Sequence, residues 1–215
     1  AAAMTRRSHA LSRRNVLGLA AAWTAPTWPA VAAATGADTF ISALDFGADP
    51  QGQKDSTQAL NAALDNTKGN SKSANAGREL RIPKGTYIVS GTVKVGSGQR
   101  LVFEPGVRID ATRLPNEETH LFVAASQNDI VMTGNGAELI GSRATARKDI
   151  EGSQTGILIY GSSNVGVRDF RIHDFATDGL CVGGESSGDK PARNVRIENC
   201  DIGGCRRNAL SIVGC

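Results

Sequence analysis

The sequence of 215 residues has few aromatic residues, only 4 cysteines and no long apolar run. It contains 6 Phe, 2 Tyr and 2 Trp against 25 Gly, which indicates a chain rich in turns. No apolar stretch approaches the roughly 20 residues that a membrane-spanning helix needs, so an integral membrane protein is excluded. With 40% hydrophobic and 21% charged residues, the composition is globular and not that of a disordered chain.

The excess positive charge is confined to the beginning of the chain. The formal net charge is +3, from 24 Lys and Arg against 21 Asp and Glu. Arg6, Arg7, Arg13 and Arg14 lie in the first 32 residues, where no acidic residue occurs, so the remainder carries 20 basic against 21 acidic residues, a net charge of −1. A nucleic-acid-binding protein that relies on a basic surface is therefore not expected.

The first residues have the organisation of an export signal. Residues 12–17, Ser-Arg-Arg-Asn-Val-Leu, precede an uncharged stretch over residues 18–34, and residues 30–32 form a small-x-small cleavage motif. The arginine pair is similar to the twin-arginine signal, although Val16 and Gly18 depart from its usual pattern.

We therefore predict a signal peptide over residues 1–32, handled by the twin-arginine export machinery. The mature protein would then be periplasmic or secreted by a bacterium, with no membrane association after cleavage. A basic amphipathic helix kept in the mature protein is the alternative, and Pro26 and Pro29 oppose it. Trp23 and Trp28 both leave with the signal, so the mature chain has no Trp for sugar stacking.

A repeat determines the predicted architecture. Residues 164–184 can be laid over residues 194–214 without a gap, at an offset of 30. The matching apolar positions are Val165 with Val195, Val167 with Ile197, Phe170 with Cys200, Ile172 with Ile202, Phe175 with Cys205, Leu180 with Leu210, and Val182 with Ile212. Apolar residues alternate in short runs broken by Gly, Asn and Asp, and no helical pattern lies between them, which indicates β-strands linked by turns.

Shorter matches extend the repeat upstream. The strand at residues 180–182 is expected to recur as Leu121-x-Val123 and Ile157-x-Ile159, with Asn128 matching Asn164. Such units bury their apolar residues by winding into coils that stack at about 4.8 Å, with like side chains above like.

We therefore predict an all-β solenoid, a right-handed single-stranded parallel β-helix over residues 33–215. Asp55, with Gln58 three residues later, predicts the start of a helix that runs to about Asn66 and covers the N-terminal end of the coils. Because the chain stops inside a repeated strand, we expect C-terminal coils to be missing from residues 33–215.

The four cysteines fit the same repeat. Cys200 and Cys205 occupy inward apolar positions, so buried thiols are favoured over a disulfide or a metal site. Cys181 stands at the outward position of Ser211, and neither it nor Cys215 has an evident partner.

Two segments carry a family resemblance. Residues 45–60, Asp-Phe-Gly-Ala-Asp-Pro-Gln-Gly-Gln-Lys-Asp-Ser-Thr-Gln-Ala-Leu, and residues 82–87, Ile-Pro-Lys-Gly-Thr-Tyr, resemble the N-terminal signature of pectate-lyase-like β-helix proteins. That group includes rhamnogalacturonase-like, polygalacturonase-like and alginate-epimerase-like enzymes, and phage tailspikes. The resemblance extends over about residues 40–215 and implies the fold, while the reaction stays open because one fold hosts many chemistries.

The resemblance places the reactive groups along the outer face of the strand at residues 180–183 and in the turns before it. Asp178 lies in Ala176-Thr-Asp-Gly179, which is similar to the Asn-Thr-Asp-Gly of polygalacturonases and implies a general acid. Hydrolysis needs a second carboxylate, and the corresponding turn one coil later, Arg-Arg-Asn at residues 206–208, has none. The alternative is a turn in which the Asp178 side chain bonds local backbone.

Arginines near this turn suit the carboxylate of a uronate. Lyases and epimerases of the resembled group pair a cation that neutralises the carboxylate with a base that removes the adjacent proton. We predict Asp178 and Arg207 as catalytic, and Arg171, Arg206 and Asn208 as substrate-binding. Solvated arginines at a coil edge are an equally good interpretation.

Other polar residues give weaker signals. His173-Asp174 suggests acid–base chemistry, but neighbouring turn residues usually point apart, so we expect placement by chance on the surface. His120 has no partner visible in the sequence. Calcium binding is open, without a spacing that defines a site, among Asp174, Asp178, Glu198 and Asp201.

These features predict an exported protein that acts on an acidic polysaccharide, by lyase-like cleavage of a polyuronide. A polygalacturonase-type glycoside hydrolase is one alternative. A non-catalytic carbohydrate-binding or surface-adhesion β-helix is another, favoured by the missing carboxylate pair and the missing Trp. A tailspike-type structural trimer is disfavoured by the export signal.

Overall fold

Parallel strands dominate the structure. The computed structural model describes residues 40–68, 77–115, 118–146, 154–184 and 190–214, which all lie in one compact unit, Ala34–Cys215. Every strand pair among them is parallel. The predicted signal peptide, residues 1–32, lies outside the described residues.

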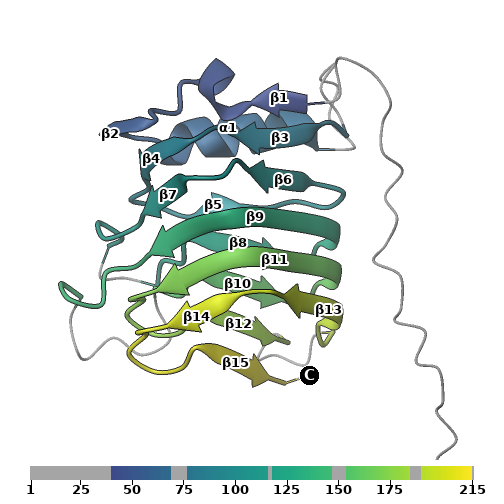
Figure 1. Ribbon diagram of the computed structural model, residues 1–215. Coiled ribbons are helices and arrows are strands. Elements are labelled where there is room, and N and C mark those ends of the chain that lie inside the picture. The colour runs from purple at the N-terminus through teal and green to yellow at the C-terminus, as the bar shows by residue number, and fades with distance from the viewer. Residues whose placement is uncertain (1–39, 69–76, 116–117, 147–153, 185–189, 215) are drawn as a thin grey trace, which may run out of the picture. The chain divides into compact units, whose positions relative to one another are not determined.

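The elements follow one another in short segments (Figure 1). In chain order they are β1 (Phe40–Ser42), the 3-10 helix η1 (Ala43–Phe46), β2 (Gln51–Asp55), α1 (Thr57–Thr67), β3 (Glu79–Ile82), β4 (Gly85–Ile88), β5 (Val93–Lys94), β6 (Arg100–Phe103), β7 (Val107–Asp110), β8 (Phe122–Ala125), β9 (Asn128–Ile140), β10 (Ile157–Tyr160), β11 (Ser163–His173), β12 (Leu180–Gly183), β13 (Arg193–Glu198), β14 (Asp201–Gly203) and β15 (Leu210–Val213).

The strands form two sheets in which hydrogen-bonded neighbours come from successive coils. Sheet B has the order β15-β12-β10-β8-β5. Sheet A contains the other ten strands, and within it β9 pairs with β6, β7 and β11. Figure 1 shows β9 and β11 in front and β8 and β10 behind them. Each turn of the chain thus leads from a strand of sheet B to strands of sheet A, and the predicted parallel β-helix is confirmed.

The offset of 30 is confirmed by the strand register. Val165 pairs with Val195 in β11 and β13, and Leu180 pairs with Leu210 in β12 and β15. The Phe170 side chain is 1% exposed, and it packs edge-on against Phe103 with ring centroids 5.1 Å apart. Like residues therefore stack in columns directed into the interior of the coils.

The register predicted upstream is wrong by one residue. Phe122, and not Leu121, pairs with Ile157, and Asp129, not Asn128, takes the place that Asn164 holds one coil later. The repeat pattern could not set this register, because Leu121 and Phe122 are adjacent apolar residues and either could begin the strand. The structure places the ring of Phe122 in the inward column, where its centroid lies 5.9 Å from that of the Phe103 ring.

The predicted N-cap of the helix, Asp55, is also wrong by one residue, because the N-cap is Ser56. Asp55 ends β2, and α1 begins at Thr57 after Ser56, whose side chain makes no capping hydrogen bond. The Asp55 carboxylate still accepts the Thr57 N–H at 2.8 Å, so it serves the helix start from the preceding strand. Pairing of β2 with β4 holds Asp55 in extended conformation.

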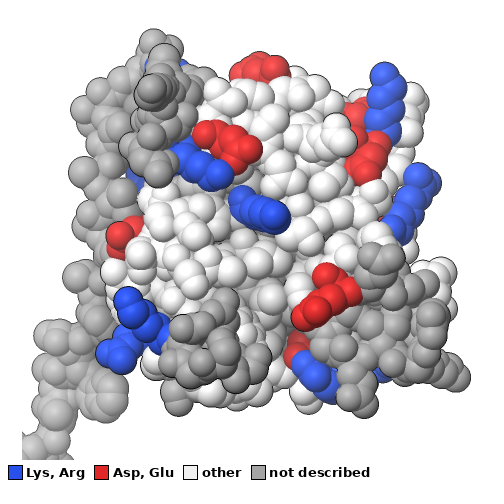
Figure 2. All heavy atoms as spheres, turned by 180° about the vertical axis from the view of Figure 1, so that it is seen from behind, with Lys and Arg blue, Asp and Glu red and all other residues white. Residues whose placement is uncertain are grey.

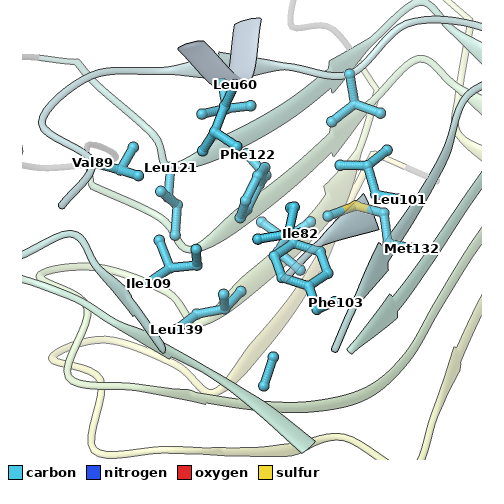
Figure 3. Packing of buried hydrophobic residues seen from close by; sticks show 14 of the residues in the cluster. Leu60, Ile82, Val89, Leu101, Phe103, Ile109, Leu121, Phe122, Met132 and Leu139 are labelled. Carbon is cyan, nitrogen blue, oxygen red and sulfur yellow. The ribbon is translucent and has the colours of Figure 1, made fainter. Parts of the chain in front are cut away.

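Helix α1 packs its apolar side on the first coils. Leu60 and Leu64 are each 1% exposed, and Figure 3 shows Leu60 directed from the helix toward Leu121 and Phe122. Burial of each such side chain contributes roughly 1.5–3 kcal/mol. Helix α1 therefore covers the core at the N-terminal coils, as predicted.

Two ladders of Asn and Asp shape the bends between strands. Asp129, Asn164 and Asn194 all have positive φ, at 60°, 56° and 50°. Asn164 Nδ2 donates to Asp129 Oδ1 at 2.9 Å, and Asn194 Nδ2 donates to Asn164 Oδ1 at 2.8 Å. Asp169 and Asn199 repeat this in the next bend, at 3.3 Å. Asn and Asp tolerate this left-handed backbone better than other side-chain-bearing residues, so each ladder holds the same left-handed position in the coils that it links.

The last described strand exposes its inward positions. Ile212 lies in the column of Val182 but is 65% exposed, against 5% for Val182. Cys200 and Cys205 pack on the core while remaining partly exposed, Cys181 is buried, and none of these three cysteines is in a disulfide. Among the described helices, none has the length and apolar character of a membrane span.

Truncating Phe170 to Ala tests the register. Because this side chain fills an inward column between coils, Phe170→Ala should lower the free energy of unfolding by about 3–5 kcal/mol, measured by urea titration. Phe170→Leu, which keeps most of the volume, serves as the control and should cost clearly less. Equal stability of Phe170→Ala and the unmodified protein would refute the inward placement.

Candidate functional site

The outer face of sheet B has uncharged and small side chains over most of its strands. Its outward positions are Lys94 in β5, Val123 and Ala125 in β8, Leu158 and Tyr160 in β10, Cys181 and Gly183 in β12, and Ser211 and Val213 in β15. Figure 2, seen from behind, shows a surface in which white atoms predominate around a few charged groups. This is the face along which the family resemblance placed the reactive groups.

A polar column precedes the strands of sheet B. His120, Thr155, Asp178 and Asn208 each stand two residues before the first paired residue of their strand. Backbone hydrogen bonds join them coil by coil, since the N–H groups that follow Thr155 and Asp178 donate to the Asp178 and Asn208 carbonyls at 3.1 Å each. The turns thus bring one polar side chain per coil to the same end of the sheet.

Asp178 is held by residues of the next coil. Arg207 Nε donates to Asp178 Oδ1 at 2.9 Å, and Arg207 Nη2 donates to Oδ2. The Asn208 N–H donates to Oδ1 at 3.2 Å, and the Ser211 hydroxyl also hydrogen-bonds the carboxylate. The Asp178 side chain is fully buried, whereas the Arg207 side chain is 51% exposed. The pair therefore presents a half-exposed guanidinium over a buried carboxylate.

These partners keep Asp178 ionised. Burial alone would raise the pKa of Asp178, but the hydrogen bonds from Arg207 and Ser211, the Arg207 charge and the Asn208 N–H outweigh it and hold the pKa below 3.8. A general acid must carry a proton at the working pH, so this environment does not suit Asp178 to protonate a leaving group. Its geometry is that of an acceptor that orients Arg207.

The other predicted arginines lie elsewhere. Arg206 Nη2 donates to the carbonyls of Arg143 and Ala146, each at 3.0 Å, and so holds the segment after β9. Arg171 lies in sheet A, where Nη2 is 3.7 Å from Glu138 Oε1. The structure therefore brings together Asp178, Arg207 and Asn208, and it does not bring Arg206 or Arg171 to Asp178. Sequence alone could not separate them because the direction of each side chain depends on its coil position.

Arg171 belongs to a ladder of alternating charge on sheet A. Arg108, Glu138, Arg171 and Asp201 are paired in successive strands, and Arg108 Nη1 donates to Glu138 Oε2 at 3.0 Å. Such partly exposed pairs contribute roughly 0–1 kcal/mol each. The ladder accounts for Arg171 without a ligand.

The expectation that His173 and Asp174 point apart is wrong. His173 Nδ1 lies 2.9 Å from Asp174 Oδ2, and Nε2 lies 3.4 Å from Glu138 Oε1. The positive φ of Asp174, 60°, turns its side chain back toward the preceding residue. Both ring nitrogens are thus engaged on sheet A, away from the strands of sheet B.

His120 gains a partner that the sequence did not reveal. The Thr155 N–H donates to His120 Nδ1 at 3.3 Å, which leaves the proton of the neutral ring on Nε2. Burial lowers the pKa of His120, with Glu118 acting in the opposite direction. Next along the column, the Thr155 and Thr177 hydroxyls are 3.1 Å apart.

Sequence reasoning missed Tyr160. This residue is the one aromatic side chain among the outward positions of the described sheet B strands. A Cβ at Gly183 would lie 3.0 Å from Tyr160 Cε2, so the ring extends over Gly183 in the next coil. The signal was available, since Tyr160 follows the inward Ile159 in the repeated strand.

The described residues contain no group of three or more His, Cys, Asp or Glu side chains that could hold a calcium ion. Asp174 and Asp178 face different partners, His173 and Arg207, so they do not share a site.

The pair of Asp178 and Arg207 predicts a pH dependence of stability. A carboxyl whose folded pKa lies below the unfolded value of 3.8 stabilises the fold above that pH, and the contribution is lost as the pH falls through the folded pKa. The deficit of Asp178→Asn relative to the unmodified protein should therefore shrink between about pH 5 and about pH 2 in urea titrations. Asp65→Asn, at an exposed position, is the control, and a deficit of Asp178→Asn that is constant with pH would contradict the assignment.

The class of protein follows from the coils and from a family comparison. Residues 40–128 match the family described as rhamnogalacturonase A/epimerase, pectate lyase-like. The resemblance predicted from residues 45–60 and 82–87 is thereby confirmed over residues 40–128, and the described strands form a parallel β-helix.

Particular relatives extend the comparison beyond residue 128. The uncharacterized protein YclG of Bacillus subtilis strain 168 is 29% identical in an alignment of 203 residues that covers 83% of this chain and 33% of that protein. The chain thus spans about a third of the length of this curated relative.

Two solved structures have the same fold. The iota-carrageenase of family GH82 from A. fortis has a TM-score of 0.61 at 20% identity, covering 85% of this chain and 40% of its own. PfbA, a surface adhesin of Streptococcus pneumoniae, has a TM-score of 0.53 at 18% identity, covering 79% of this chain and 50% of its own. At these identities the likeness establishes the fold and leaves the reaction open.

Proposed function

We propose that the protein is carbohydrate-active and binds an acidic polysaccharide along the outer face of sheet B. The carrying observation is the half-exposed Arg207 guanidinium, which Asp178 and the coil stack hold in a fixed orientation beside that face. A guanidinium recognises a carboxylate or sulfate through paired hydrogen bonds. Tyr160, two coils before Arg207, adds an aromatic surface of the kind that small-molecule sites use.

For the whole protein, we propose lyase-like cleavage of a polyuronide. In such a reaction the arginine neutralises the uronate carboxylate, a base removes the proton on the neighbouring carbon, and the electron pair expels the glycosidic oxygen as a double bond forms. Arg207 and Asn208 supply the binding part of this scheme. Hydrolysis of the polygalacturonase type is less well supported, because Asp178 is held ionised and faces an arginine instead of a second carboxylate.

A non-catalytic carbohydrate-binding or surface-adhesion protein is the second candidate. The full set of partners on Asp178 favours it, since a carboxylate that accepts hydrogen bonds from Arg207, Asn208 and Ser211 has a structural role without any reaction. The fold shared with the surface adhesin PfbA is compatible with it.

Export belongs to the same proposal. The twin-arginine-type sequence at residues 12–17 and the cleavage motif at residues 30–32 support delivery to the periplasm or the outside of the cell, where polysaccharides are found. Fusion of residues 1–32 to a reporter that is active only after export would test this step, with Arg13→Lys/Arg14→Lys as the control that should abolish it.

Product analysis separates the candidate reactions. The full protein is incubated with pectate, alginate and rhamnogalacturonan, and the ultraviolet absorbance of new double bonds is followed beside total reducing ends. A lyase raises both signals together, and Arg207→Lys and Arg207→Ala should lower the rate far more than His173→Ala, which alters only sheet A.

Other outcomes point to the alternatives. Reducing ends without the absorbance would overturn the lyase proposal in favour of hydrolysis. Binding in affinity electrophoresis with neither signal would establish the binding protein. A lack of binding to all three polymers would refute an acidic polysaccharide ligand of this type.

A further inference from the structure

A hollow lies on the outer face of sheet B beside β5 and β8, the first two strands of that sheet along the chain, whereas Arg207 precedes the last strand, β15. It has a volume of about 370 Å³ and is lined by Lys68, Lys94, Val95, Gly96, Val123, Ala125 and Gln127. We infer that this hollow is a second subsite, which binds the anionic group, carboxylate or sulfate, of a sugar residue in the same polysaccharide chain. The inference rests on the proposed function. It adds a second position at which the polymer is held and the charged groups that hold it there.

Two lysines give the hollow its charge. Lys94 is the outward residue of β5, and Lys68 directly follows the end of α1. The remaining lining residues are uncharged, so the hollow has two ammonium groups and no carboxylate among the residues that line it. Lysine binds phosphate, sulfate and carboxylate groups as a compact point charge.

The positions of both lysines are fixed by the coil. Asn61 Oδ1 of helix α1 accepts the Lys94 N–H at 2.9 Å, and Asn61 Nδ2 donates to the Thr92 carbonyl at 2.8 Å. Helix and first sheet B strand are thereby joined, which holds Lys68 and Lys94 beside the same hollow. Gly96 and Ala125 are among the lining residues, and their small size leaves space at these positions.

One lysine already has a carboxylate partner outside the hollow. Lys68 Nζ lies 2.5 Å from Asp65 Oδ1, and both side chains are well exposed, at 43% and 65%. Such an exposed pair is weak, so a ligand anion can replace Asp65 at little cost. Within the described residues Lys94 has no carboxylate partner. The hollow thus contains one unpaired cation and one that is loosely paired.

The hollow and Tyr160 lie along one line of the sheet. Ala125, Tyr160 and Gly183 are paired outward positions of β8, β10 and β12, and Gly96, two residues after β5, lines the hollow together with Ala125. Successive coils are about 4.8 Å apart, so the ring of Tyr160 begins about one coil beyond Ala125. A polymer that follows this line would place one sugar over Tyr160 and the anion of a neighbouring sugar in the hollow.

Neutralising the lysines tests the subsite. Binding of the full protein to polygalacturonate and to iota-carrageenan is measured by affinity electrophoresis, with a neutral galactan as the uncharged reference. Lys68→Gln/Lys94→Gln should weaken binding about tenfold, as expected for two charges of somewhat under 1 kcal/mol each. Asp65→Asn should strengthen binding about two- to fivefold because it releases Lys68. Lys84→Gln, an exposed lysine between β3 and β4, is the matched control and should leave binding unchanged.

Each outcome decides a separate question. Weaker binding of the double lysine variant, together with stronger binding of Asp65→Asn, supports the subsite. The polymer that responds then identifies the anion as carboxylate or sulfate. Normal binding by Lys68→Gln/Lys94→Gln, with unchanged thermal unfolding, overturns the subsite but leaves the proposed function standing. If the unmodified protein binds neither polymer, the proposed function fails and the subsite fails with it.

Discussion

The stacking of equivalent residues in adjacent coils is the constraint on which the rest of the structure depends. Strands about 4.8 Å apart place like side chains in columns, so an apolar column directed inward is buried from one coil to the next. Phe103, Phe122 and Phe170 pack edge-on in this interior. The same repetition that builds the core also places outward and turn residues in columns, so any binding surface of this fold is linear.

The column of polar residues before sheet B shows how the coils build a site. Asp178 comes from one coil and Arg207 from the next, and neither coil alone would hold the pair. The buried carboxylate determines where the guanidinium points, and the same hydrogen bonds lower the pKa of Asp178. A change in coil spacing or register would therefore separate Asp178 from Arg207.

Opposite faces of the coils use charge differently. On sheet A, Arg108, Glu138 and Arg171 satisfy one another across strands. On sheet B, cationic side chains stand at the two ends of a largely uncharged face, with Lys94 at one end and Arg207 at the other. The sheet A charges are neutralised between neighbouring strands, whereas on the sheet B side Arg207 pairs with the buried Asp178 of the preceding coil.

The sequence by itself determined the parallel β-helix, the offset of 30 and the inward columns, because a repeated apolar pattern can be buried only by stacking in register. It could not choose between Leu121 and Phe122 as the start of a strand, since both are apolar and only packing against Phe103 separates them. Nor could it separate Arg207 from Arg206, because neighbouring side chains in a turn diverge, one to Asp178 and the other to Arg143. The pairing of charges and the hollow beside Lys94 arose only in the tertiary structure, where residues about 30 positions apart become neighbours.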